Sequence, residues 1–440
     1  MSDLSRRDCL NWALAAAGAL PFEAASAAMR RTRHRVYGAH KHHADRWHKA
    51  GGDPESLNGL AAANGLRFGS CIGTAPTAEQ AAWLAKAMQA DPGLAQNPPA
   101  PLQPKTRRPP SYDDRSLRAL MVAQCSLLVP ENELKWYALR WKPGKFDFAR
   151  ADILVDFAAR HGMGVRGHTL LWNRNNWMPP WVANYDFGAN PARQAERMLR
   201  EHITAVCRRY GERIFSYDVI NETVAPDTGD LEASVFTKIL GPDVVDICFH
   251  AAREAAPHAQ LVYNDYMSWR PKDEAHRAGV LKLLDRMKKN DVPVDALGLQ
   301  SHIGSAKEPL DPSGFEVVDE TAWRKFLDEV TAMGLDLVVT EFDVNDRYLP
   351  ADPVLRDRAV ADFAKRYLDL VLSYPQLRYV MAWGLIDRYS WLQRNTPRAD
   401  GAAKRPCPYT DDYKPAALRD AMAQSFLAAP ARPGLAVNPA

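Results

Sequence analysis

The sequence predicts an α/β protein with one catalytic-size domain, a (β/α)8 TIM barrel, because short apolar segments alternate with segments of helical periodicity. The apolar segments are rich in β-branched and aromatic residues, which is typical of strands buried in a parallel sheet. Eight strands are expected, at residues 66–71, 126–129, 163–167, 215–220, 260–263, 295–299, 336–340 and 379–383. A chain of 440 residues accommodates such a barrel, which commonly has about 250 residues or more.

Helical periodicity in the intervals between these strands supports the same fold. The segments with this pattern include residues 57–65, 77–90, 111–124, 191–210, 243–255, 273–288, 320–333 and 356–374. No internal repeat or coiled-coil period interrupts the alternation. The barrel domain is expected at residues 57–428, with a proline-rich insertion at about 91–111 and a C-terminal tail at 429–440.

The first 27 residues resemble a twin-arginine signal peptide. Arg6 and Arg7 precede an alanine-rich run that ends in small residues at 25–27, and this run is too short for a lasting membrane anchor. We therefore expect export to the periplasm or the cell exterior, with an amphipathic helix of no export function as the alternative. The basic, histidine-rich residues 28–56 are interpreted as a solvated linker rather than a metal site.

Composition argues against several classes of protein. The 56 Lys and Arg residues nearly balance the 53 Asp and Glu residues, and a net charge of +3 gives no reason to expect nucleic acid as a partner. The six cysteines show no CxxC pair and no metal-ligand spacing, so buried free thiols are expected. Twelve tryptophans suit either core packing or stacking on sugar rings.

Two of the expected strands lead into glutamates. The strand 215–220 runs into Asn221 and Glu222, and the strand 336–340 ends at Glu341. In a parallel barrel the carboxyl ends of all strands face the same way, so the two carboxyl groups should meet in one cleft. Two close carboxylates cannot both ionise easily, which leaves one protonated as an acid and the other charged as a nucleophile, the equipment of a glycosidase. Taken singly, each glutamate would more simply be a charged strand cap.

The polar and aromatic residues that follow the other strands indicate a functional site. Carboxylate, amide, imidazole, ammonium and indole groups follow the strands, at Glu131, Asn132, Lys135, His168, Trp172, Asn264, Asp265, Tyr266, Gln300, His302, Trp383 and Trp391. The loops that follow the strands carry the site in this architecture. So many chemically active groups at these positions are very improbable as independent structural accidents.

Seven motifs made of these residues resemble those of the β-1,4-xylanase family, glycoside hydrolase family 10. They are Glu-Asn-x-x-Lys-Trp, Arg-Gly-His-Thr-Leu-x-Trp, Asp-Val-x-Asn-Glu, Asn-Asp-Tyr, Gln-Ser-His, Thr-Glu-x-Asp and Trp-Gly-x-x-Asp-x-x-Ser-Trp. The resemblance covers about residues 57–427. Each motif alone is a weak signal, but seven in the same order and on the same strands are specific.

The resemblance implies a retaining mechanism that uses two carboxyl groups about 5–5.5 Å apart. Glu222 would be the general acid/base and Glu341 the nucleophile. Asn221 would hydrogen-bond the sugar 2-hydroxyl beside the cleaved bond. His302 would orient Glu341, with Asp343 behind it as a second partner.

The resemblance also implies a set of sugar-binding residues. Those expected to bind sugars on the non-reducing side are Glu131, Asn132 and Lys135. Those expected around the cleaved bond are His168 and Gln300, with Trp383 and Trp391 as an aromatic wall, and Tyr266 is also expected to bind substrate. Trp172 would form the floor of the same subsite, although core packing is an alternative for this residue.

Some positions depart from the family pattern. Asn173 and Asn175 stand where His and Gln are usual, in a longer loop, and Met267 stands where a second Asn is common. These changes are expected to alter the walls of the groove. The basic residues of the loop 394–405 suggest a further hypothesis, that this loop contacts an acidic sugar substituent, and a solvated surface loop is the alternative.

Together these observations predict an exported endo-1,4-β-xylanase that cuts internal bonds of xylan or a related β-linked polysaccharide. We expect no cofactor, no metal, no nucleic-acid partner and no membrane anchor, and we expect the enzyme to act as a monomer. One alternative is a related β-glycanase that acts on another polysaccharide, such as a bacterial exopolysaccharide. Another is a barrel that binds carbohydrate without catalysis, which the presence of both Glu222 and Glu341 argues against.

Overall fold

The computed structural model describes residues 51–83, 110–305, 310–395 and 397–432. The expected signal peptide at 1–27, all but residues 51–56 of the linker, all but the last two residues of the insertion, and residues 433–440 of the tail lie outside the described residues. Export and these domain boundaries therefore stay predictions.

Eight parallel strands form a closed barrel, which confirms the predicted fold. The strands are β1 (Arg67–Ile72), β2 (Leu127–Pro130), β3 (Gly164–Trp172), β4 (Ile214–Asn221), β5 (Gln260–Asp265), β6 (Ala296–Leu299), β8 (Asp336–Asn345) and β9 (Leu377–Ala382). Each pairs in parallel with its neighbour, and the ring closes because β6 pairs with β8 and β9 pairs with β1.

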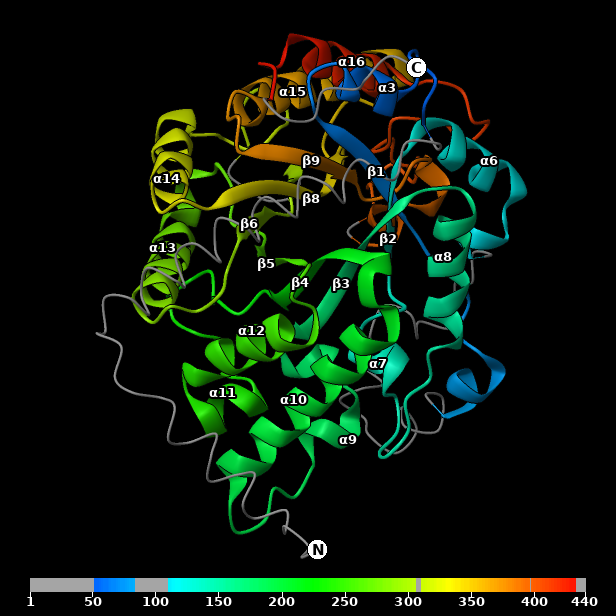
Figure 1. Ribbon diagram of the computed structural model, residues 1–440. Coiled ribbons are helices and arrows are strands. Elements are labelled where there is room, and N and C mark those ends of the chain that lie inside the picture. Colours follow the sequence, from blue (N-terminus) through cyan, green and yellow to red (C-terminus); the bar gives the residue numbers. More distant parts are fainter. Residues whose placement is uncertain (1–50, 84–109, 306–309, 396, 433–440) are drawn as a thin grey trace, which may run out of the picture.

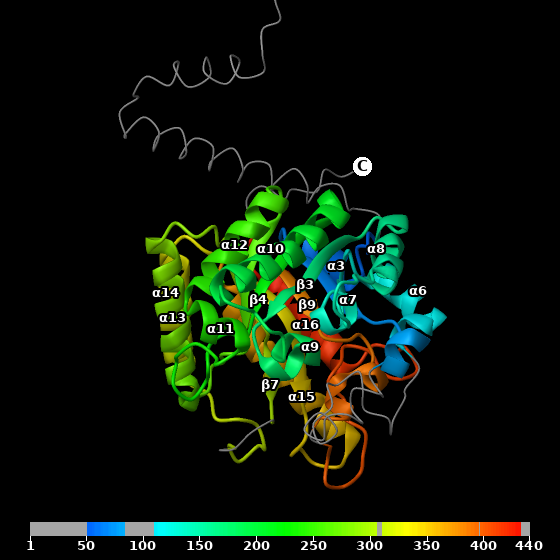
Figure 2. The ribbon, with the colours of Figure 1, turned by 90° about the horizontal axis from the view of Figure 1, so that it is seen from below.

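Helices surround the ring of strands, as Figure 1 shows. They are α3 (Leu57–Ala62), α6 (Arg115–Gln124), α7 (Trp136–Leu139), α8 (Ala149–Arg160), α9 (Pro180–Ala183), α10 (Pro191–Tyr210), α11 (Val235–Leu240), α12 (Asp243–Ala255), α13 (Glu274–Lys289), α14 (Glu320–Ala332), α15 (Pro353–Leu372) and α16 (Ala417–Ala428). In the view turned by 90°, α13 and α14 stand on one side of the barrel and α6 and α8 on the other (Figure 2). None of the helices in the described ranges has the length and apolar character needed to cross a membrane.

The helix ends follow from local side-chain chemistry. Asp114 precedes α6 and accepts hydrogen bonds from two backbone N–H groups of its first turn. Asp352 caps α15 in the same way, with Pro353 at the first helical position. Gly211 ends α10 with φ of 51°, a conformation that glycine adopts without the penalty of a side chain. In these three helices, such local signals mark where the helix begins or ends between two barrel strands.

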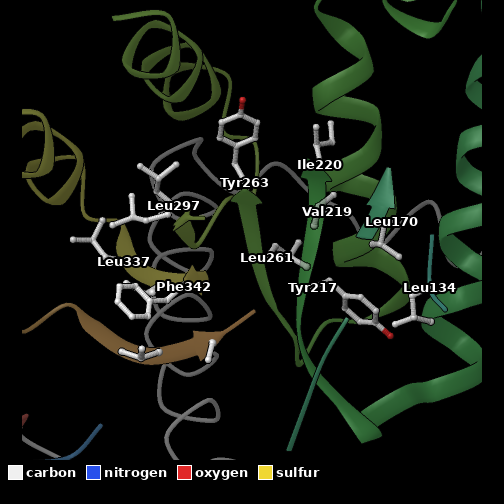
Figure 3. Packing of buried hydrophobic residues seen from close by; sticks show 14 of the residues in the cluster. Leu134, Leu170, Tyr217, Val219, Ile220, Leu261, Tyr263, Leu297, Leu337 and Phe342 are labelled. Carbon is white, nitrogen blue, oxygen red and sulfur yellow. The ribbon is translucent and has the colours of Figure 1, made fainter. Parts of the chain in front are cut away.

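The core lies on both faces of the barrel wall, because successive side chains of a strand point to opposite faces. Leu261 and Leu337 belong to the large cluster shared with the surrounding helices (Figure 3). Val262, Ala296 and Val338 form a separate cluster of strand residues alone, which places it inside the barrel. All five cysteines in the described part of the chain are buried free thiols, as expected. A filled interior leaves the rim at the carboxyl ends of the strands as the place for a site.

The strand that carries Glu341 is longer than the sequence predicts. Glu341 was expected at a strand end, but β8 continues to Asn345. The extension exists because a short extra strand, β7 (His302–Gly304), pairs with residues 343–345 of β8. The pairing of β8 with β9 shifts register between Val339 and Phe342, an irregularity of the kind that re-aims side chains beside active sites. Glu341 therefore lies at this irregularity, inside a strand.

Candidate active site

Glu222 follows β4 in a left-handed backbone conformation, with φ of 54°. This region costs a residue other than glycine about 1–2 kcal/mol. The surrounding structure enforces it, because the Glu222 backbone N–H donates to the carbonyl of Asn264 at 2.9 Å. Strain of this kind clusters at functional sites, which makes the position a candidate for chemistry.

The Glu222 carboxyl is held by three side chains. Trp172 Nε1 donates to one oxygen at 3.0 Å, and Gln300 Nε2 donates to the other at 2.9 Å. Arg174 Nε lies 3.6 Å from Oε2. Burial nevertheless raises the pKa of Glu222 above its usual value, and the negative charges of Asp265 and Glu341 add to this against the opposing effects of Arg174 and Gln300. The environment therefore favours a protonated Glu222.

The pKa of the Glu341 carboxyl is shifted in the opposite direction, to a lower value. Asn264 Nδ2 donates to Oε1 at 2.8 Å, and His302 Nε2 lies 3.3 Å from Oε2. Burial alone would raise its pKa, but His168, His302 and Lys135 outweigh burial and lower the pKa to about 2. At neutral pH Glu341 is therefore ionised.

One hydrogen-bond network joins the two carboxyl groups. Asn264 Nδ2 donates both to Glu341 and to Asn221 Oδ1, the latter at 2.8 Å. Gln300 Nε2 lies 3.3 Å from the same Asn221 oxygen while it donates to Glu222. Two carboxyls whose pKa values are shifted in opposite directions within one network are suited to the roles of an acid and a nucleophile.

His302 connects Glu341 to a second carboxylate. Its Nδ1 lies 2.9 Å from Asp343 Oδ1, and Trp391 Nε1 donates to the other oxygen of Asp343 at 2.7 Å. Burial disfavours the imidazolium, but Asp343 and Glu341 outweigh it and raise the pKa of His302 to about 10. His302 is therefore a cation at neutral pH, and its contact with Asp343 fixes the orientation of its ring.

The residues after β2 lie on the same rim. Lys135 Nζ donates to Asn132 Oδ1 at 3.2 Å and lies 4.8 Å from the ring centre of Trp172 and 5.8 Å from that of Trp383. Burial lowers the pKa of Lys135, while Glu341, Glu131 and Glu222 act to raise it. The charge of Lys135 therefore faces both carboxyls of the proposed pair.

Glu131 lies on this side of the site as well. Burial and the charge of Glu133 raise the pKa of Glu131 to about 7, against the effects of Lys135, Asn132 and Arg394. A carboxyl poised near neutrality can either donate to or accept from a sugar hydroxyl.

Trp172 contacts three other side chains at the rim of the barrel. One ring face stacks on Trp177, with centroids 4.3 Å apart and planes within 8°. The ammonium of Lys135 lies over the Trp172 ring, and its N–H holds Glu222. These contacts engage the ring and its N–H, and the hydrogen bond from the N–H holds the Glu222 carboxyl beside the ring.

A buried ion pair inside the barrel supports His168, and sequence reasoning did not single it out. Arg166 and Asp218 are fully buried and pair at 2.5 Å, and Asp218 Oδ2 lies 2.9 Å from His168 Nδ1. His168 Nδ1 also lies 3.9 Å from Glu341 Oε1. Charged residues in the middle of two otherwise apolar strands were the available signal, because such groups are buried only when paired.

Asn173 and Met267 are buried and so do not form walls of the groove, whereas Asn175 is exposed. Asn173 is fully buried, and its Nδ2 group donates to Thr223 at 2.6 Å. Asn175 Oδ1 accepts from the backbone of Val235 at 2.8 Å, and Met267 is buried in the core. These departures from the expected pattern therefore anchor the loop after β3 to the segment before α11.

The basic loop after β9 is held by the protein itself. Arg398 is buried, pairs with Asp400 and donates to the carbonyl of Leu349 at 2.8 Å. Arg405 pairs with Asp357 on α15. Arg398 and Arg405 are thus already paired with carboxylates of the protein, and the prediction that this loop contacts an acidic sugar substituent then depends on its other basic residues.

The other two basic residues of that loop, Lys404 and Arg394, differ in their exposure to solvent. Lys404 is buried, donates to the carbonyl of Asn395 at 3.0 Å, and has its pKa lowered by burial to about 8. Arg394 is exposed, and its charge acts on Glu131. Of the four basic side chains, Arg394 alone keeps an exposed position from which its charge reaches the site.

Arg174 is the main site residue that sequence reasoning missed. Its side chain is 21% exposed and touches both Glu222 and Tyr266, whose hydroxyl accepts from Nη2 at 2.6 Å. The available signal was its position, two residues after Trp172, the last residue of β3. Within the described ranges, no group of three or more His, Cys, Asp and Glu side chains is arranged to hold a metal ion.

The expected site residues thus gather at the carboxyl rim of the barrel, around two glutamates whose pKa values are shifted in opposite directions. A (β/α)8 barrel with such a carboxyl pair at its carboxyl rim is typical of glycosidases. The chain belongs to Glycosyl hydrolase family 10, whose sequence profile matches residues 105–425.

Individual relatives agree with this family. Endo-1,4-beta-xylanase A of Caldicellulosiruptor sp. (strain Rt8B.4) is 33% identical over 289 residues, which are 61% of this chain but 39% of that protein. Beta-1,4-xylanase of Dictyoglomus thermophilum is 32% identical over 274 residues, which are 60% of this chain and 72% of that protein. The structure of xylanase 10B from Thermotoga petrophila RKU-1 in complex with xylobiose matches 84% of this chain and 97% of that chain with a TM-score of 0.65 and 24% identity, which shows the shared fold.

Proposed function

We propose that this chain is a retaining endo-1,4-β-xylanase in which Glu222 is the acid/base and Glu341 the nucleophile. The observation that carries the proposal is that one hydrogen-bond network holds both carboxyls, with the pKa of Glu222 raised and that of Glu341 lowered. The short connection through Asn221, Asn264 and Gln300 supports the close carboxyl spacing of a retaining enzyme. Xylan is the proposed substrate because the two relatives above are named xylanases.

In the first step the ionised Glu341 attacks the anomeric carbon as the glycosidic bond breaks. The bonding electrons pass to the leaving oxygen, which takes the proton of Glu222, and a glycosyl ester forms on Glu341. Forming the ester removes the negative charge of Glu341, one of the influences that raise the pKa of Glu222. Glu222 is then ionised and takes a proton from water as the water oxygen attacks the anomeric carbon. The bond between that carbon and the Glu341 oxygen breaks, which releases the Glu341 carboxylate and leaves Glu222 protonated again.

Neighbouring side chains would orient the sugar for these steps. Asn221 Oδ1 is occupied by Asn264 and Gln300, while its Nδ2 group makes no hydrogen bond to the residues that the structure describes. That amide is a suitable donor to the 2-hydroxyl, a contact that strengthens in the transition state. Lys135 and Glu131 supply a cation and a carboxyl for the hydroxyls of the adjoining sugar.

The substrate and the stereochemistry can be tested together. The purified enzyme is expected to release a ladder of medium-length oligosaccharides from xylan, and NMR spectra recorded during hydrolysis should show the β-anomer of the new reducing end first, because double displacement retains configuration. Matched digests of a cellulose-type glucan and an acidic exopolysaccharide serve as controls. Initial release of the α-anomer would exclude the retaining mechanism, and faster hydrolysis of either control polymer would reassign the substrate.

The charge of His302 predicts a pH effect. His302→Gln keeps a hydrogen-bond donor but removes a cation that favours ionised Glu341, so the pKa of Glu341 rises from about 2. Activity requires ionised Glu341, and the acid limb of the kcat/KM profile should therefore move to higher pH by about 1–2 pH units. His250→Gln removes an exposed imidazole on α12 and should leave the limb in place. Equal behaviour of the two variants would remove His302 from the mechanism.

A further inference from the structure

The loop after β3 and the loop after β4 are tied together beside the acid/base. Ser234 Oγ donates to Asn173 Oδ1 at 2.6 Å, and Asn173 Nδ2 lies 2.9 Å from Thr237 Oγ1. Asn175 holds the backbone of Val235 two residues further on. These contacts fix the backbone on either side of Arg174, so the position of its side chain is set by a braced loop.

The guanidinium of Arg174 is held on several sides. Its Nε donates to the backbone carbonyl of Glu222 at 3.3 Å and lies 3.6 Å from the carboxyl Oε2 of the same residue. Its Nη2 donates to the Tyr266 hydroxyl at 2.6 Å and pairs with Glu232 at 2.7 Å. Both partners of the Arg174–Glu232 pair are largely covered, with side chains 21% and 27% exposed. Solvent therefore screens this charge less than it would a surface arginine.

Building on the proposed function, we propose that Arg174 is a positioning residue for the acid/base. Its guanidinium, balanced by Glu232, holds the Glu222 carboxyl in place and favours the ionised form that the second step of hydrolysis requires. Arg174 contacts Glu222 and acts through it.

The charges that face Glu222 come from four places on the rim. Asp265 at the end of β5 and Glu341 on β8 act against ionisation of Glu222. Arg174 after β3 favours it, and Lys135 after β2 also interacts with the Glu222 charge. Within this balance Arg174 is the cation nearest the Glu222 carboxyl among the described ion pairs.

The chemistry needs such a balance because Glu222 must be protonated in one step and ionised in the next. Burial together with the charges of Asp265 and Glu341 favours the acid needed first. When the ester forms, the charge of Glu341 disappears while that of Arg174 stays. Arg174 therefore helps most in the second step, where Glu222 acts as the base.

The test compares Arg174→Met with Arg174→Lys and Glu232→Gln. Loss of the guanidinium should raise the pKa of Glu222, so the basic limb of the kcat/KM profile on xylan should move to higher pH by about one pH unit in Arg174→Met. Arg174→Lys retains a charge and should restore part of the shift. Glu232→Gln leaves the guanidinium uncompensated and should move the limb to lower pH. Arg193→Met removes an exposed arginine of α10 and should leave the limb unchanged.

A second measurement does not depend on turnover. A ¹³C NMR titration of enzyme with labelled glutamate, with the Glu222 resonance assigned from its loss in Glu222→Gln, should report shifts of the same signs in the same variants. Unmoved titration of Glu222 in Arg174→Met, or shifts of one sign in both Arg174→Met and Glu232→Gln, would overturn the role of Arg174. Absence of xylan hydrolysis by the parent enzyme would instead overturn the proposed function, and the titration would still decide whether Arg174 controls Glu222.

Discussion

Glu341→Ala is expected to reduce kcat on xylan by about 10⁴-fold or more, the scale of loss when a catalytic nucleophile is removed. The variant lacks the oxygen that forms the glycosyl ester, and no other group in the network can replace it. Asn264 and His302, which contact the Glu341 carboxyl, remain in place, so substrate binding should suffer far less than kcat. Steady-state kinetics on xylan oligosaccharides measures the two effects separately.

Two controls separate this chemical effect from misfolding. Glu329→Gln removes an exposed carboxylate from α14 and should leave kcat unchanged. Azide added to Glu341→Ala can occupy the space of the lost carboxylate and attack the anomeric carbon of an activated aryl glycoside, which gives an α-glycosyl azide in a single inversion. A β-glycosyl azide from this variant would place the nucleophile elsewhere, and so would kcat within tenfold of the parent enzyme.

The barrel could be predicted because its strands obey a simple rule. Segments such as 215–220 and 336–340 are apolar on both faces, as strands between an inner core and a layer of helices must be. The structure places Val338 inside the barrel and Leu337 against the helices, so both faces needed apolar residues. The exact strand ends could not be predicted, because the extension of β8 depends on its pairing with β7, which forms from a segment about 40 residues away.

Site residues close to the ends of the predicted strands could be predicted from the sequence. The residues that form ion pairs with charged groups near the site often could not. Glu222 and Glu341 stand out in the sequence as a pair, because each follows an apolar strand-like segment, although either alone would more simply be a charged strand cap. Arg174 carried no such signal, since its importance arises from Glu232, which a different loop brings to it. The pairing of Arg405 could not be predicted for the same reason, because its partner Asp357 lies on a helix 48 residues earlier in the chain. A charge pattern in one loop cannot reveal which charges are already neutralised.

Glu222→Ala is expected to behave differently from Glu341→Ala, because an acid/base is needed only when the leaving group or the attacking water requires proton transfer. On xylan, whose leaving sugar alkoxide needs a proton, kcat should fall by about 10²–10⁴-fold. On an aryl glycoside with a dinitrophenolate leaving group, the first step needs no proton and should proceed at nearly the parental rate. The second step then becomes slow, so a burst of phenolate followed by a low steady rate is expected.

The burst also identifies the step that Glu222 serves after the ester has formed. During the slow phase the glycosyl ester on Glu341 should accumulate, and intact-protein mass spectrometry should detect it. Azide should accelerate the slow phase because it attacks the ester without needing a general base, and the product should be the β-glycosyl azide, opposite in configuration to that from Glu341→Ala. The basic limb of the pH profile should disappear together with the titrating group. Equal loss of activity on xylan and on the activated glycoside, without a burst, would assign Glu222 to substrate binding and leave the proton donor unidentified.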